Sequence, residues 1–259
     1  MKRQATWGLA LALAVLCLAF SGCKKPSTEV SIRTLEVNEV QNQDSLYLAI
    51  DFPEGGREPL RKAIEEFISE TLGGTYEGDY AQADSMLAFY KEQYFRDMME
   101  VRGEFLDDVP MEFFKEVLIS KVYETDKVVT YQVTTDEYYG GAHGIATTSG
   151  TTFRKSDGRR VGLDMLRDQE LHEFLKEGLM DYFGVKTERE LEDNLMGVDD
   201  LYLLPMPETE PYFMDGGMVL IYQSYEIACY AAGQPTVVIP YDKLEPLFNV
   251  TGRRLFIDK

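Results

Sequence analysis

Residues 136–144 have the sequence Asp-Glu-Tyr-Tyr-Gly-Gly-Ala-His-Gly and join two segments that are predicted to be β-strands, Val128 to Thr135 and Ile145 to Arg154. Paired glycines allow positive φ angles or a close approach to another surface, while tyrosine and histidine offer flat faces with hydrogen-bonding tips. Two interpretations stay open: a recognition edge for a glycan or a protein, and a structural bend in which His143 bonds to backbone inside the fold. The candidate binding residues here are Tyr138, Tyr139, Gly140, Gly141, His143 and Gly144.

Outward from this loop, the middle of the chain is strand-rich. The segment Phe113 to Tyr123 precedes the four residues 124–127, which are typical of a turn, and is expected to pair with Val128 to Thr135. A second hairpin is predicted at Ser156-Asp157-Gly158, because an Asp-Gly pair accepts the positive φ that tight hairpin turns require.

The N-terminal part changes its hydrophobic period along the chain. Alternating apolar residues predict strands over 30–37 and 46–50, joined by a turn over 38–44. Apolar residues at helical spacing then predict one helix ending at Gly73-Gly74 and another ending near Gly103.

The C-terminal part returns to helix and then to strand. The expected elements are a helix over 171–183 closed by Gly184, a short acidic helix over 188–196, strands over 219–227 and 236–239, a helical turn over 242–248 and a terminal strand over 254–257. Strands, helices and strands again, without strict βαβ repetition, predict an α+β fold in which a mainly antiparallel sheet packs with helices. We expect two sub-domains in one compact body.

A second segment is as specific as the first. Residues 222–233 read Tyr-Gln-Ser-Tyr-Glu-Ile-Ala-Cys-Tyr-Ala-Ala-Gly and add Tyr225 and Tyr230 to the candidate binding residues, with the packed-turn alternative again open. The two segments, with the Asp157-Gly158 hairpin and the 171–183 helix between them, resemble the C-terminal extracytoplasmic domain of the RsiV-like family over residues 112–248. The resemblance predicts a 30–111 N-terminal α+β sub-domain and a 112–259 RsiV-like C-terminal domain.

The resemblance implies binding more than catalysis. In RsiV this region binds lysozyme, and the same domain accompanies peptidoglycan deacetylases, in which a different domain is catalytic; it also occurs alone in lipoproteins. We expect neither the membrane-spanning and sigma-binding segments of the first nor the catalytic domain of the second in this chain. Cys229 departs from the proline that is usual in the family, and no catalytic residues carry over.

The first 22 residues resemble an export signal. Lys2 and Arg3 precede an apolar run of 14 residues, Trp7 to Phe20. A helix of that length spans about 21 Å, short of the ~30 Å hydrocarbon core of a membrane, so 1–22 is predicted to be a signal peptide. Small residues before Cys23 resemble a lipobox; the alternative is an ordinary cleavage near Gly22. We expect lipidation at Cys23, a 23–29 tether, and a lipid-anchored protein of the bacterial cell envelope, on the periplasm-facing side of the outer membrane.

Charge and cysteine content limit the functions of the chain. Lys and Arg number 26 against 45 Asp and Glu, and removal of Lys2 and Arg3 with the signal leaves 24 minus 45, or −21, over 259 minus 22, or 237, residues. Such an acidic protein is not expected to bind nucleic acid. Cys229 is the last free thiol once the signal is cut and Cys23 is acylated, so no intrachain disulfide is expected.

The sequence contains no G-x-S-x-G, P-loop, G-x-G-x-x-G or H-E-x-x-H motif. Only His143 and His172 are present, and we expect no metal, no cofactor and no catalytic residue. The sequence therefore favours a non-catalytic, lipid-anchored binding domain that recognises peptidoglycan or a peptidoglycan-active protein such as lysozyme. The alternative is a periplasmic hydrolase that acts on cell-wall glycan through carboxylates or His143.

Overall fold

The structure is a computed structural model that describes residues 29–105, 112–167, 170–198 and 200–258. The predicted signal peptide, Cys23 and all but the last residue of the tether lie outside the described residues. Within the described part, no helix combines the length and the apolar character needed to cross a membrane.

The larger body is built on a six-stranded sheet in which the strands follow one another in sequence order. Every neighbouring pair is antiparallel except β2 and β3, which run parallel. Parallel neighbours need a long crossover, and two helices supply it. The elements are β1 (Ile32–Gln41), β2 (Asp44–Pro53), α1 (Glu58–Leu72), α2 (Ala83–Phe105), β3 (Phe114–Glu124), β4 (Val128–Tyr138), β5 (Ile145–Arg154) and β6 (Arg160–Val161).

Local sequence explains where these elements begin and end. The β1–β2 hairpin turns on Asn42 and Gln43, both at positive φ, as a two-residue primed turn requires. A proline in the first turn starts α1, and Gly73 ends it at a φ of 137°. The helix α2 runs past Gly103 to Phe105, two residues beyond the predicted end, since an isolated glycine weakens a helix without stopping it.

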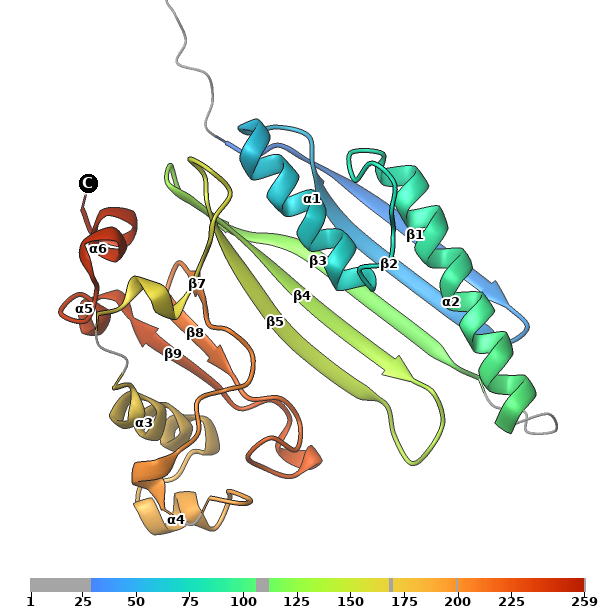
Figure 1. Cartoon of the computed structure of the whole chain (residues 1–259). Helices are drawn as coiled ribbons and strands as arrows, with labels where there is room; N and C mark the ends of the chain where they lie inside the picture. The colour runs from blue at the N-terminus through green and yellow to red at the C-terminus, as the bar shows by residue number, and fades with distance from the viewer. Residues whose placement is uncertain (1–28, 106–111, 168–169, 199, 259) are drawn as a thin grey trace, which may run out of the picture.

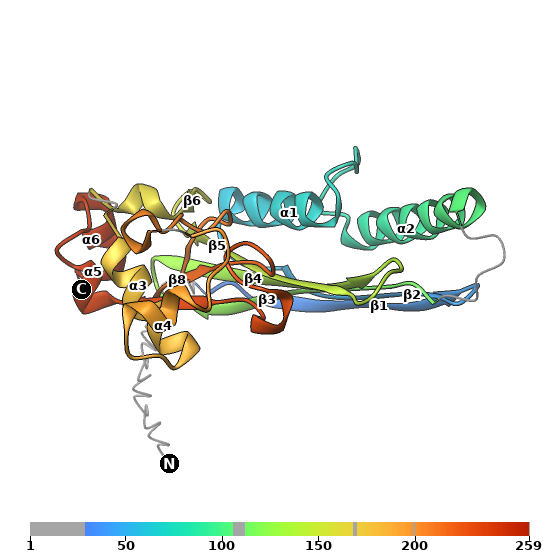
Figure 2. The ribbon, with the colours of Figure 1, turned by 90° about the horizontal axis from the view of Figure 1, so that it is seen from below.

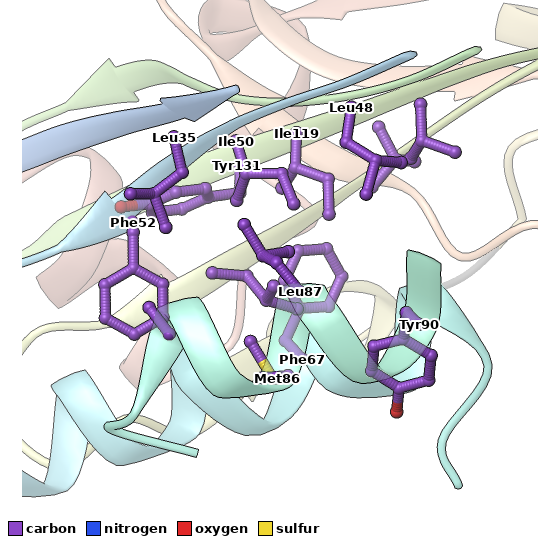
Figure 3. Packing of buried hydrophobic residues seen from close by; sticks show 14 of the residues in the cluster. Leu35, Leu48, Ile50, Phe52, Phe67, Met86, Leu87, Tyr90, Ile119 and Tyr131 are labelled. Carbon is purple, nitrogen blue, oxygen red and sulfur yellow. The ribbon is translucent and has the colours of Figure 1, made fainter. Parts of the chain in front are cut away.

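Both helices cover the same face of the sheet, as Figure 2 shows. Their apolar stripes bury Leu60, Ile64 and Met86 against inward residues of the strands, such as Ile50 and Ile119. Figure 3 shows this packing, with Phe67 and Leu87 pointing toward the sheet. We call this side of the sheet the covered face; it contains the larger hydrophobic cluster of the described residues.

The smaller body follows Val161 and has its own hydrophobic cluster. A three-stranded antiparallel sheet in the order β7-β8-β9 lies beside helix α3, which contacts β9. Figure 1 shows this body beside β5. Its elements are η1 (Leu163–Met165), α3 (His172–Phe183), α4 (Glu188–Glu192), η2 (Leu201–Leu203), β7 (Tyr212–Met214), β8 (Gly217–Ile221), η3 (Tyr230–Ala232), β9 (Thr236–Pro240), α5 (Tyr241–Leu244) and α6 (Val250–Phe256).

The α+β class with a mainly antiparallel sheet is confirmed, but two expected elements are wrong. The predicted terminal strand over 254–257 belongs to α6 and the residue after it. Asn249 caps this helix, since its side chain accepts hydrogen bonds from the amides of Thr251 and Gly252. The strand predicted over 219–227 ends at Ile221, and the residues after it form turns.

The two bodies meet through buried threonines on the face opposite α1 and α2. Thr130 Oγ1 donates to Phe213 O at 2.7 Å, and Thr152 Oγ1 accepts from Phe213 N at 2.8 Å. Beside them Gly150 lies under Tyr212, where a Cβ atom would approach the ring to 2.5 Å. The small body therefore packs on the β4 and β5 end of that face.

The sheet crosses the domain boundary that we expect between residues 111 and 112. Strand β2, from the N-terminal part, pairs with β3 from Ser45 to Ile50, and Phe113 and Phe153 share one cluster with the residues of α1 and α2. The boundary between residues 111 and 112 remains a prediction from the sequence. In the structure, the two main hydrophobic clusters separate near Val161.

Candidate functional site

The two predicted segments meet at the end of β4 and β5. The ring of His143, from the β4–β5 loop, stacks on the ring of Tyr230 with centroids 3.8 Å apart and planes 22° apart. The ring of Tyr225 lies 6.1 Å from His143 and 5.8 Å from Tyr230. All three side chains are exposed. We call these three residues the aromatic cluster.

Hydrogen bonds orient the imidazole of His143. Its Nδ1 lies 2.8 Å from the carbonyl oxygen of Gly144, which only accepts, so Nδ1 carries a proton. With the proton on Nδ1, its Nε2 accepts a hydrogen bond from the phenolic hydroxyl of Tyr225 at 3.0 Å. The ring of His143 is therefore exposed, and it bonds to a side chain as well as to the backbone.

Tyr225 has an unusual backbone conformation. Its φ is +72°, and outside the β1–β2 turn it is the single non-glycine residue at positive φ among the described residues. A bulky residue there carries about 1–3 kcal/mol of backbone strain, and such strain is concentrated at functional sites. The side chain of Tyr225 is 54% exposed, so burial of that side chain does not compensate the backbone strain.

Two glutamines fasten the second segment to the edge of β5. The side-chain amide of Gln223 donates to Thr148 O at 2.8 Å and accepts from Thr148 N at 3.3 Å, as a neighbouring strand would. Gln234 donates to Gln223 Oε1 at 2.7 Å and accepts from Thr148 Oγ1 at 3.0 Å. Neither glutamine is among the candidates predicted from the sequence, although their position on either side of Tyr225 and Tyr230 was a usable signal. They keep the aromatic cluster next to the sheet.

The other predicted residues of the loop shape it. Gly140 and Gly141 have φ values of 99° and 100°, which favour glycine. The phenol of Tyr138 donates to Gly141 O at 2.9 Å and its ring stacks on Phe114. Gly144 passes so close to the backbone of β4 that a Cβ atom would lie 2.9 Å from Glu137 O.

The structure places Tyr139 apart from the aromatic cluster, because consecutive strand residues point to opposite faces. Its ring contacts Phe113 edge to face and lines a cleft with Tyr94 and Asp97 from the middle of α2. Burial, followed by the nearby carboxylate of Glu137, raises the pKa of Tyr139 far above that of a free phenol. Of the candidate residues, His143, Tyr225 and Tyr230 come together and Tyr139 does not join them.

Both ring nitrogens of His143 are engaged in hydrogen bonds, one with a carbonyl oxygen and the other with a phenol. No group of three or more His, Cys, Asp or Glu side chains able to hold a metal ion occurs among the described residues. His172 is exposed at the first position of α3, and Cys229 is free and exposed next to Tyr230.

Comparisons with known proteins bear on the fold. Residues 165–242 form a domain that matches the family model "Protein of unknown function (DUF3298)"; it includes Tyr225 and Tyr230 but not His143. A crystal structure of a DUF3298 family member from Bacteroides fragilis is 20% identical, with a TM-score of 0.75, over 87% of this chain and 96% of that chain. A DUF3298 family protein from Pseudomonas aeruginosa is 15% identical, with a TM-score of 0.59, over 86% and 95%. A search of curated proteins gives no match.

Proposed function

We propose that the protein is a lipid-anchored binding domain of the bacterial cell envelope that uses the aromatic cluster to recognise a peptidoglycan-active protein such as lysozyme. The observation that carries the proposal is the convergence of His143, Tyr225 and Tyr230 into one exposed set of rings from two distant segments. The RsiV-like resemblance of these same segments supports this class of partner.

The geometry of the cluster suits an interface. Aromatic side chains supply large contact area with little loss of conformational freedom, and tyrosine is enriched at energetic centres of interfaces. The hydrogen bonds to Gly144 and Tyr225 hold His143 in place before a partner arrives. Such preorganisation reduces the entropy lost on binding.

Charge favours a basic protein over the wall polymer itself. The expected mature chain carries −21, as derived above, and peptidoglycan strands carry carboxylates on their peptides. A strongly acidic domain is repelled by an anionic polymer and attracts a basic enzyme, which raises the association rate. Stacking of a glycan ring on Tyr230 is the competing outcome and is part of the test.

The position of the cluster fits an anchored domain. Glu124 accepts a hydrogen bond from Val30 N at 2.8 Å, so the chain enters the fold next to the β3–β4 turn. The cluster lies at the other end of β4, whose 11 residues span about 36 Å. A tether on Cys23 would therefore leave the aromatic cluster pointing away from the membrane.

Release of a Cys23→Ser variant from the membrane fraction tests the anchor, and its retention after a high-salt wash would contradict lipidation there.

The binding test uses a 24–259 fragment, which contains every described contact of the fold. Surface plasmon resonance with lysozyme, and sedimentation with insoluble peptidoglycan, compare the wild type with a His143→Ala/Tyr230→Ala variant. Tyr202→Ala is the matched control, because Tyr202 is 68% exposed on η2, outside the cluster. Loss of about 2 kcal/mol or more of binding free energy for lysozyme is expected for the cluster variant and little change for the control.

Two results would contradict the proposal. One is the absence of lysozyme binding by the wild type at low salt. The other is equal binding by the wild type and the cluster variant, which would leave the loop as a structural bend. Cosedimentation with peptidoglycan that depends on Tyr230 would identify the glycan, and not a protein, as the ligand of the cluster.

A further inference from the structure

The six-stranded sheet has a second face on which no described helix or strand covers β1 and β2, as Figures 1 and 2 show. We call it the open face, defined by Glu36, Tyr47, Glu116, Leu118, Asp136 and Tyr138. Alternation assigns these residues to that side, because Leu35, Leu48, Val117 and Ile119 point into the core beneath α1 and α2. The apolar members of the open face belong to no buried cluster of the described residues.

Charge distinguishes the open face from the covered face. On the covered face, acidic residues of the strands have basic partners, as in Lys91 with Glu39 at 2.7 Å and Lys115 with Glu137 at 3.6 Å. Glu36, Glu116 and Asp136 take part in none of the ion pairs of the described residues. The residues of β1 to β4 on the open face include acids but no lysine or arginine.

Two of these acids oppose each other directly. In the register of β3 and β4, Glu116 pairs with Asp136, and Tyr47 of β2 pairs with Glu116. Like charges directly opposite on neighbouring strands destabilise a sheet. The fold retains this repulsion on the side that has no cover, which is expected where the acids serve an external partner.

We propose that the open face binds a cationic polypeptide surface, with Glu116 and Asp136 at its centre. This inference deepens the proposed function, because it names the chemistry of the partner and a second part of its footprint. Tyr47, Leu118 and Tyr138, all half-buried, supply apolar area around the acids. Acids flanked by aromatic and aliphatic side chains match lysine and arginine, whose long stems pack on apolar surface while their charged ends reach carboxylates.

The open face continues into the aromatic cluster. Gly144, whose carbonyl oxygen accepts the hydrogen bond of His143, lies next to Asp136 of the open face. A Cβ atom added to Gly144 would lie 3.6 Å from Asp136 Oδ1. The open face spans the four strands β1 to β4, so its outer strands lie about 14 Å apart at about 4.8 Å per spacing. The aromatic cluster lies beyond the end of β4 and extends this surface.

Other occupants fit the charges less well. A second copy of the chain would bring the same unpaired acids against Glu116 and Asp136, and an anionic lipid or glycan would be repelled. A partner with a basic patch meets neither obstacle, and its charge compensates the acids that the fold leaves unpaired.

The test measures binding of fluorescein-labelled deca-lysine to the 24–259 fragment by fluorescence anisotropy at low salt. The open-face variant is Glu116→Gln/Asp136→Asn. Its matched control, Glu66→Gln/Glu92→Gln, removes the same two charges from exposed positions of α1 and α2. We expect binding to weaken about fivefold in the open-face variant and less than about twofold in the control.

The outcomes separate this inference from the proposed function. Equal weakening by the two double variants, or no binding of deca-lysine by the wild type, would overturn the open face as a cationic site. A His143→Ala/Tyr230→Ala variant that still binds deca-lysine but loses lysozyme supports both. If the wild type does not bind lysozyme, and among the variants only the open-face variant loses deca-lysine binding, the result supports the open face as a cationic site and excludes lysozyme as the partner.

Discussion

The two faces of the six-stranded sheet share the same strands but differ in cover and in charge. On the covered face, Ile119 is fully buried and strand acids such as Glu137 have lysine partners. On the open face, its neighbour Leu118 is half-buried and Glu116 has no basic partner among the described ion pairs. Alternation along one strand thus separates residues that stabilise the fold from residues that are free to meet a partner.

The same contrast holds along β3 between two acids of one strand. Glu124 is bonded by Lys155 and by Lys121 at 2.9 Å, as well as by Val30 N, and so joins the N-terminal entry of the chain to the β5–β6 hairpin. Burial opposes ionisation of Glu124, but these hydrogen bonds outweigh it and lower the pKa of this carboxyl. Glu116 lacks any such set of donors. Paired acids hold the sheet, whereas unpaired acids weaken it slightly.

The largest effect is expected from a pair of adjacent substitutions in β3. Ile119→Ala removes a fully buried side chain beneath α1 and α2 and should lower the free energy of unfolding by about 3 kcal/mol. Leu118→Ala acts on the open face and should lower it by less than about 1 kcal/mol. Urea unfolding of both variants measures the difference. Equal losses would mean that the second face is buried in solution.

The next effect concerns the paired acid. Glu124→Gln leaves Lys155, 6% exposed, without its anionic partner and should lower the free energy of unfolding by about 2 kcal/mol at pH 7. Since folding lowers the pKa of Glu124 from its ordinary value of about 4.5, the stabilisation is complete above that pH and is lost as the pH falls through the folded value. Wild type and variant should therefore converge in acid. A constant gap from pH 7 to pH 3 would contradict the ion-pair assignment.

The smallest effect has the opposite sign. Glu116→Gln/Asp136→Asn removes the repulsion between β3 and β4 and should raise the free energy of unfolding by about 0.5 kcal/mol at low salt. Added salt screens this repulsion, so the gain should shrink as ionic strength rises. Thermal unfolding at two salt concentrations checks it. If the double variant is less stable than the wild type, the two acids have partners and the open face is not an unpaired acidic surface.

Much of the fold could be predicted because its signals are local. Asp157-Gly158 marks a hairpin, and Gly73 and Gly184 mark helix ends at positive φ. The α6 helix was missed because Leu255-Phe256-Ile257 is a continuous apolar run that suits a strand as well as a buried helix. The N-cap at Asn249 shows that this run belongs to a helix. In the sequence alone, a single asparagine is a weak signal for the start of a helix.

The candidate site could be predicted in its residues but not in its arrangement. Each segment nominated aromatic residues, yet nothing local says that His143 meets Tyr225 and Tyr230. Alternation at the end of β4 already separates Tyr138 from Tyr139, and applying it would have removed Tyr139 from the group. The open face could not be predicted without the tertiary structure, because alternating residues show that a strand has two faces but not whether both are covered.

The most direct test of the account is site-specific photo-crosslinking to lysozyme from each side of the sheet. A benzoylphenylalanine probe replaces Leu118 on the open face in one version of the 24–259 fragment and Met99, 63% exposed on α2, in the other. The account predicts a lysozyme adduct from position 118 that decreases as salt rises, and none above background from position 99. An adduct from position 99 with none from position 118 would place the partner on the helices and contradict the central claim.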